Sequence, residues 1–61
     1  IDLLLETGDD FLVIDYKLKG IDEAAYEEQI TGYVTMLSGV ADKSVKGYLY
    51  SILDKRFKQV I

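Results

Sequence analysis

Residues 11–18 read Phe-Leu-Val-Ile-Asp-Tyr-Lys-Leu, four apolar residues followed by alternating charge. The apolar run does not alternate with polar residues, which predicts a strand covered on both faces. Asp15 and Lys17 lie two residues apart and therefore on the same face of a sheet. Buried charges are costly unless they are paired, bound to a metal or open to water. Two interpretations follow: the strand leaves the core at Asp15, or it carries a functional pair of charges.

The chain has 61 residues and contains neither cysteine nor histidine. A chain of this length forms at most one small domain and buries only about 60% of its unfolded surface. Disulfides, zinc–thiolate sites and imidazole chemistry are excluded. Catalysis or metal binding would have to use carboxylates, lysines, tyrosines and the backbone, whose oxygens suit hard cations such as magnesium, manganese or calcium.

The net charge of −4 is unevenly distributed. Residues 1–28 contain nine acids and two lysines, whereas residues 29–61 contain five bases and two acids. The acidic total argues against an independent nucleic-acid-binding domain, which normally has a basic face. It is compatible with a site that gathers carboxylates around a cation, because the metal inverts the local field.

The apolar segments are too short for a membrane span, which needs about 20 residues, and no signal peptide is visible. We therefore expect a soluble, cytoplasmic chain without a membrane partner. Both ends of the chain are apolar, at Ile1 and at Val60-Ile61. This pattern is typical of a segment cut from a larger protein.

Residues 1–6 are predicted to form a short strand that pairs with residues 11–18 through a turn. Gly8-Asp9 suits a type II′ hairpin turn, and a symmetric four-residue loop would give the same register. This register places Asp2 directly opposite Asp15, with Cβ atoms about 5 Å apart on the same face as Lys17. Two facing carboxylates repel each other, and a cation between them would turn that penalty into a binding site.

A helix is predicted from residue 23 to about Ser38, with Asp22 as the N-cap and Gly39 as the C′ residue. One stripe of this helix is apolar: Tyr26, Ile30, Tyr33, Val34 and Leu37. Gln29 lies on the flank of the stripe, and its i, i+4 spacing makes it a neighbour of Tyr33. The plain alternative for Gln29 is a solvated amide at the edge of the stripe.

After this helix, residues 45–53 are predicted to form a strand parallel to residues 11–18, joined by a right-handed crossover. Tyr48 and Tyr50 share a face with Lys46. We expect both tyrosines to pack under the helix, with stacking on nucleic-acid bases as the alternative.

A tight turn at Asp54-Lys55 leads to a predicted edge strand over residues 56–61. Three basic residues lie here: Lys55, Arg56 and Lys58. They could contact a DNA backbone, and a solvated edge explains them equally well.

Two motifs in this chain occur together in a known superfamily. Asp2, a turn and then Asp15-Tyr16-Lys17 resemble the core motif of the PD-(D/E)xK nucleases. Gln29-Ile30-Thr31-Gly32-Tyr33 is similar to the Q-x-x-x-Y motif of the RecB-like branch. Over essentially all 61 residues, the chain resembles the C-terminal nuclease domain of a RecB- or AddA-type helicase–nuclease or a related exonuclease.

The resemblance implies an α/β (α+β) fold: a restriction-endonuclease-like mixed sheet in the order β-β-α-β-β, without the family's N-terminal helix and first strand. Residues 1–61 would be the C-terminal part of that domain. The implied activity is hydrolysis of DNA phosphodiesters with magnesium or manganese, in DNA repair and recombination. The implied partners are DNA and the rest of a larger helicase–nuclease chain or complex.

The resemblance also implies roles for individual residues. Asp2, Asp15 and the backbone carbonyl of Tyr16 would bind the metal. Lys17 would position or deprotonate the attacking water, or stabilise the charge that grows on the phosphate. Gln29 and Tyr33 would orient the site or contact the DNA backbone.

A further acid of the family precedes the position of Asp2. Since that part is missing here, we expect residues 1–61 alone to have little or no nuclease activity and to self-associate through an exposed sheet edge and an uncovered face. Two alternatives remain. One is a non-catalytic DNA-binding or protein-interaction module that keeps the fold, and the other is a small α/β segment whose charges are ordinary surface residues.

Overall fold

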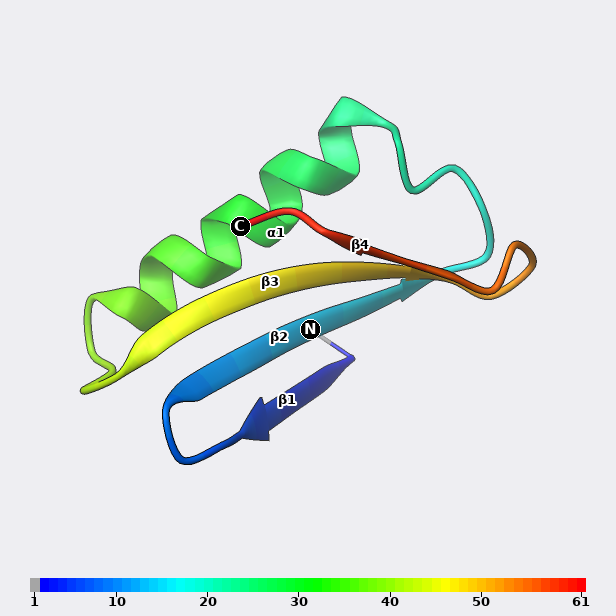
Figure 1. Ribbon diagram of the computed structural model, residues 1–61. Coiled ribbons are helices and arrows are strands. Elements are labelled where there is room, and N and C mark those ends of the chain that lie inside the picture. The colour runs from blue at the N-terminus through cyan, green and yellow to red at the C-terminus, as the bar shows by residue number, and fades with distance from the viewer. Residues whose placement is uncertain (1) are drawn as a thin grey trace.

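The predicted hairpin, helix and parallel strand are all present in the computed structural model, which describes residues 2–61 (Figure 1). The chain is a small α+β domain with one four-stranded mixed sheet in the order β1-β2-β3-β4 and one helix. Its elements are β1 (Leu3–Glu6), β2 (Asp10–Lys17), α1 (Ala24–Ser38), β3 (Ser44–Ser51) and β4 (Arg56–Gln59).

The β1–β2 hairpin has the predicted register, with Leu3 opposite Ile14 and the two strands antiparallel. The predicted type II′ turn is wrong, because Gly8 does not adopt the positive φ that this turn requires. The loop is instead closed by Thr7. Its Oγ1 accepts the N–H of Asp10 at 2.9 Å, and its own N–H donates to the Asp10 carbonyl at 2.8 Å. This loop is also symmetric, so the register is unchanged.

Strands β2 and β3 are parallel, with Val13 opposite Gly47, and α1 forms the crossover between them. Figure 1 shows α1 lying along one face of the sheet. The fourth strand pairs antiparallel with β3 and forms the sheet edge, as predicted. The third strand ends at Ser51 rather than at Leu53, because residues 52–55 already belong to the turn.

The core lies between α1 and the sheet. Alternate residues of β3 are buried on the α1 side: Val45, Gly47, Leu49 and Ser51. A Cβ atom on Gly47 would lie 2.8 Å from Cγ2 of Val34 and closer still to Ile30. The missing side chain therefore lets the helix approach the strand. Ile30 and Val34 are buried, which confirms the predicted apolar stripe.

The opposite face of the sheet carries aromatic side chains. The prediction that Tyr48 and Tyr50 pack under the helix is wrong, because the alternation of β3 directs them away from α1. Tyr50 instead contacts Tyr16 and Phe57. In the described part of the chain, no helix lies over this face.

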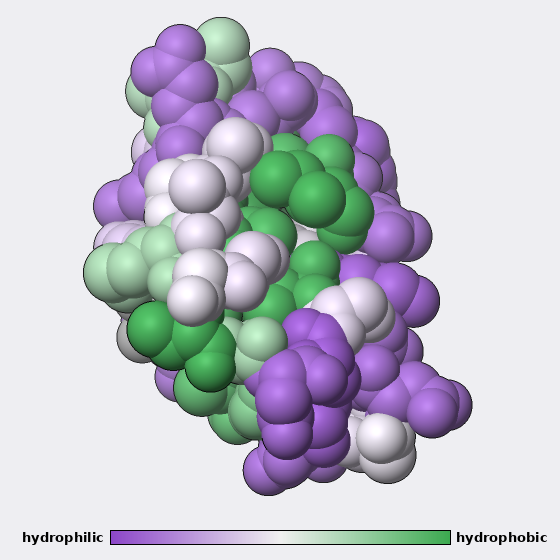
Figure 2. Space-filling model, turned by 90° about the vertical axis from the view of Figure 1, so that its left-hand side faces the viewer, coloured by the Kyte–Doolittle hydropathy of each residue, from purple (hydrophilic) through white to green (hydrophobic). Residues whose placement is uncertain are grey.

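Large apolar side chains also reach the surface, which appears as green areas bordered by hydrophilic atoms in Figure 2. The exposed ones are Leu4, Leu5, Tyr16, Leu18, Met36, Val40, Ile52, Leu53, Phe57 and Ile61. No helix in residues 2–61 is long and apolar enough to cross a membrane.

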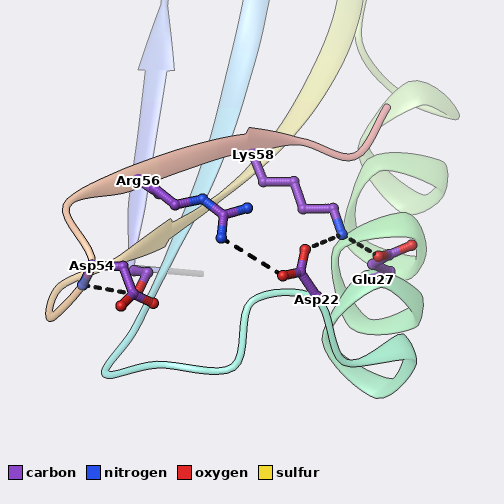
Figure 3. A network of polar contacts seen from close by, with 6 residues as sticks. Asp22, Glu27, Asp54, Arg56 and Lys58 are labelled. Atoms are coloured by element: carbon purple, nitrogen blue, oxygen red, sulfur yellow. Dashed lines mark hydrogen bonds and ion pairs between the residues drawn. The ribbon is translucent and has the colours of Figure 1, made fainter.

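The ends of α1 differ from the predicted ones. Asp22 is not the N-cap; Glu23 occupies that position without a side-chain hydrogen bond. The Asp22 carboxylate instead accepts Nζ of Lys58 at 3.0 Å and pairs with Arg56 at 3.7 Å (Figure 3). At the other end, Gly39 has a φ of −69° and so lacks the left-handed conformation of a C′ glycine.

Two of the basic residues of the last hairpin, Arg56 and Lys58, form ion pairs with acids at the start of α1. Lys58 lies between Asp22 and Glu27, with its Nζ 2.6 Å from Oε2 of Glu27 (Figure 3). These pairs connect β4 to the start of α1.

Candidate functional site

The site is built around the carboxyl end of β2, where Asp15 lies on the α1 side of the sheet with 6% of its surface exposed. Asp2 stands beside it just before β1. Its N–H donates to the Ile14 carbonyl at 3.3 Å, and its Oδ2 accepts the N–H of Tyr16 at 2.8 Å. The hairpin register thus brings the two predicted carboxylates together.

The two carboxyl groups shift each other's pKa in opposite directions. Burial raises the pKa of Asp15, and the neighbouring Asp2 carboxyl group raises it further. The neighbouring Asp15 carboxyl group lowers the pKa of Asp2, and the N–H of Tyr16 lowers it further. Asp15 is therefore the member of the pair that holds a proton longer, because it is buried while Asp2 is exposed.

Lys17 is the last residue of β2, and its side chain extends towards α1. Its Nζ lies 3.5 Å from Oδ2 of Asp15 and donates a hydrogen bond to Oε1 of Gln29 at 3.0 Å. Gln29 is thus more than a solvated amide at the edge of the helix. Strand and helix together place four of the predicted residues in one group: Asp2, Asp15, Lys17 and Gln29.

Tyr26 is a member of this group that we did not predict as a site residue. Nζ of Lys17 lies 4.5 Å from the centroid of the Tyr26 ring, within the range of a cation–π contact. The signal was present in the sequence, because Tyr26 precedes Gln29 by three residues and so lies on the same side of the helix. Its assignment to the apolar stripe obscured this second contact.

Tyr33 lies one turn beyond Gln29 on α1. It is half-buried and packs against the hydrophobic core. The contacts of the Lys17 ammonium are made by Asp15, Gln29 and Tyr26. A role for Tyr33 in the site stays a prediction.

The predicted backbone ligand is the carbonyl of Tyr16. The N–H of Tyr16 points towards β1, where it donates to Asp2. The carbonyl of the next residue, Lys17, points the other way, towards β3, and accepts the N–H of Ile52 at 2.8 Å. Because successive carbonyls of a strand alternate in direction, the Tyr16 carbonyl points to the same side as Asp2.

Two carboxylates and a carbonyl form a set of oxygen donors that suits a hard cation. Magnesium is typically held by one or two carboxylates, with waters and substrate phosphates in the remaining positions. Within residues 2–61, no three acidic side chains come close enough together to hold a metal by themselves. The residues present therefore fit a cation that keeps several positions for water and phosphate.

Comparison with family models, with curated proteins and with solved structures finds no match to this chain.

Proposed function

We propose that the chain is the carboxylate-bearing part of a RecB-like PD-(D/E)xK nuclease domain with a restriction-endonuclease-like sheet, which hydrolyses DNA phosphodiesters with magnesium or manganese. The observation that carries the proposal is the hairpin register, which brings Asp2 beside the end of β2, where it accepts the N–H of Tyr16 at 2.8 Å and where Nζ of Lys17 lies 3.5 Å from Asp15. A buried carboxyl group with a raised pKa beside a second carboxyl group is costly to retain without a function.

The chemistry requires that the negative charge of the phosphodiester is neutralised before water attacks. A divalent cation would polarise the phosphate oxygen and lower the pKa of a bound water. Asp2, Asp15 and the Tyr16 carbonyl would hold this cation. Lys17 would position the water or stabilise the charge that develops on the phosphate, because its ammonium is already fixed on the same face as Asp15.

Gln29 and Tyr26 would act on Lys17 and not on the substrate. The amide oxygen of Gln29 accepts a hydrogen bond from the Lys17 ammonium, and the Tyr26 ring covers another side of the same group. The long lysine side chain is thereby held in one orientation, which is the condition for a precise contact with a phosphate.

Metal binding is tested first, on the 61-residue chain itself. Manganese should broaden the NMR amide signals of Asp2, Asp15 and Tyr16 before all others. Asp15→Asn should abolish this broadening, because the amide keeps the shape and loses the charge. The matched control is Asp9→Asn in the exposed hairpin loop, which should leave it unchanged. Equal broadening in the Asp15→Asn variant would contradict the proposed metal site.

Hydrolysis is tested on the complete protein that contains these residues. We expect magnesium-dependent cleavage of DNA, reduced at least about 100-fold by Lys17→Ala, the usual cost of losing one donor to a developing charge. Cleavage at the wild-type rate in that variant would exclude the role given to Lys17.

A non-catalytic DNA-binding or protein-interaction module is the second candidate. It is favoured by the lack of a third acid near Asp15 within residues 2–61. DNA binding by the complete protein without cleavage, together with no effect of manganese on the NMR signals, would support this candidate and reject the nuclease.

A further inference from the structure

Lys58 of β4 lies in the same row of the sheet as Asp15. The register pairs Asp15 with Leu49 and Leu49 with Lys58, so these three residues cross β2, β3 and β4 in one line. Leu49 is buried on the α1 side, and directly paired residues share a face, so Lys58 also lies on the α1 side. Two strand spacings place its backbone about 10 Å from that of Asp15. Lys58 is thus close to the candidate site without belonging to it.

The ammonium group of Lys58 is bound by two acids at the start of α1. Its Nζ lies 3.0 Å from Oδ1 of Asp22, just before the helix, and 2.6 Å from Oε2 of Glu27, in the first turn (Figure 3). Glu27 raises the pKa of Lys58, and Asp22 raises it further, so the group stays charged. A cation near a helix N-terminus is disfavoured by the helix macrodipole, and these two carboxylates offset that cost.

The start of α1 has few other anchors. The N-cap residue Glu23 makes no side-chain hydrogen bond to the helix. Between Ile21 and Ile30, which are buried, no side chain is buried, and Tyr26 packs only partly against the core. The ion pairs of Lys58 therefore provide a fixed contact where a capping side chain or a buried side chain would otherwise be needed.

The same part of α1 holds Lys17 of the candidate site. Tyr26 directly precedes Glu27, and Gln29 follows it by two residues, so a movement of this turn moves all three. The ammonium of Lys17 donates to Gln29 at 3.0 Å and lies 4.5 Å from the centroid of the Tyr26 ring. Two lysines from the two neighbours of β3 therefore meet the same stretch of helix: Lys17 from β2 and Lys58 from β4.

We infer that Lys58 is a positioning residue for Lys17. By fixing the first turn of α1 through its two acidic partners, it sets the place at which Gln29 and Tyr26 hold the Lys17 ammonium. The consequence for DNA cleavage rests on the nuclease function proposed above, whereas the position of Lys17 can be measured without any activity. Ion pairs with exposed partners contribute little to stability, so loss of the Lys58 charge should displace Lys17 without unfolding the domain.

NMR signals of the Lys17 side chain test the inference on the 61-residue chain. The ring current of Tyr26 should shift the Hε signals of Lys17 upfield, because the ammonium lies over that ring. Lys58→Met removes the charge and keeps an unbranched side chain, and it should reduce this shift by at least about half. Lys58→Arg should retain the shift, because a guanidinium can pair with both carboxylates.

Two substitutions in α1 form a matched pair. Glu27→Gln weakens the contact of the helix with Lys58 and should also reduce the upfield shift of Lys17. Glu28→Gln removes the same charge one residue further along, at an exposed side chain that takes no part in the ion pairs of residues 2–61. It should leave the Lys17 signals unchanged, because a general effect of charge on the helix is common to both variants.

Three results would overturn the inference. The first is an unchanged set of Lys17 signals in Lys58→Met. The second is an equal change in Glu27→Gln and Glu28→Gln, which would show a general effect of charge on the helix. The third is loss of the upfield shift in Lys58→Arg, because a positive charge at this position would then not be what fixes the turn.

DNA cleavage by the complete protein that contains these residues separates the inference from the proposed function. Magnesium-dependent cleavage should fall about 10- to 100-fold in Lys58→Met, because a small misplacement of a catalytic group is costly, and it should recover in Lys58→Arg. A wild type that cleaves no DNA would reject the nuclease and leave the NMR result to decide the role of Lys58. Cleavage by Lys58→Met at the rate of an active wild type would overturn the inference.

Discussion

At the scale of single residues, the pKa of Asp15 links the site to the stability of the domain. Burial makes the folded state hold the Asp15 proton more tightly than the unfolded state does. The contribution of Asp15 to the free energy of unfolding is thus fully present at low pH, and it is lost as pH rises from about 3.8 through the raised pKa. Asp2 acts in the opposite sense, and its contribution is lost as pH falls below about 3.8. The pair therefore contributes most near pH 4.

We expect Asp15→Asn to remove the alkaline side of this dependence. The metal-free variant should lose less stability between pH 4 and pH 7 than the wild type, because an amide does not ionise. Thermal unfolding at several pH values measures the difference, and 1 kcal/mol corresponds to about 4–8 °C in Tm for a domain of this size. Asp9→Asn serves as the control. Parallel pH profiles of the wild type and Asp15→Asn would contradict the assigned pKa shift.

The residue scale also shows what could not be read from the sequence. The pairing of Asp2 with Asp15 was predictable, because a symmetric loop and strand alternation are local properties. The contact of Lys17 with Tyr26 was predictable only in part. Helix spacing places Tyr26 on the same side as Gln29, but the contact also depends on the distance at which α1 crosses the end of β2. Asp22 was assigned as a cap on local evidence, and it is instead engaged by Lys58, 36 residues away.

At the scale of elements, one position decides which face of the sheet α1 covers. The two faces of β3 differ in bulk: one contains Gly47 and Ser51, and the other contains Tyr48 and Tyr50. The helix packs on the face with the small residues because its Ile30 and Val34 occupy the space that a side chain at 47 would fill. The order of the elements was predictable from their patterns, whereas this choice of face required comparing the sizes of the side chains.

Substitution of two glycines by alanine tests the packing of α1. Gly47→Ala should destabilise the domain by about 1–3 kcal/mol, because the added Cβ would overlap Ile30 and Val34. Gly32→Ala is the matched control. It lies in α1 with no atom within 4 Å of the new Cβ, and it should stabilise the domain by about 0.5–1 kcal/mol. Urea denaturation measures both, and changes of the same sign would contradict the packing described.

At the scale of the whole molecule, the ion pairs that hold separate elements together follow the division of charge along the chain. The pairs that link residues 1–40 to residues 41–61 all place the acid in the first segment and the base in the second: Glu6–Lys43, Asp10–Lys46, Asp22–Arg56, Asp22–Lys58 and Glu27–Lys58 (Figure 3 shows the last three). The uneven distribution of charge along the sequence thus supplies the two partners of each of these tertiary ion pairs.

This division makes the chain a pair of complementary peptides joined by an exposed connection at Val40, whose surface is 84% exposed. Peptides 1–40 and 41–61 carry opposite net charge, and their complementary surfaces should allow them to reassemble after cleavage. Salt should slow and weaken the reassembly, because exposed ion pairs are screened within about 10 Å at 0.1 M. Once joined, the two peptides should remain held by the apolar contacts of α1 with β3, which salt does not screen.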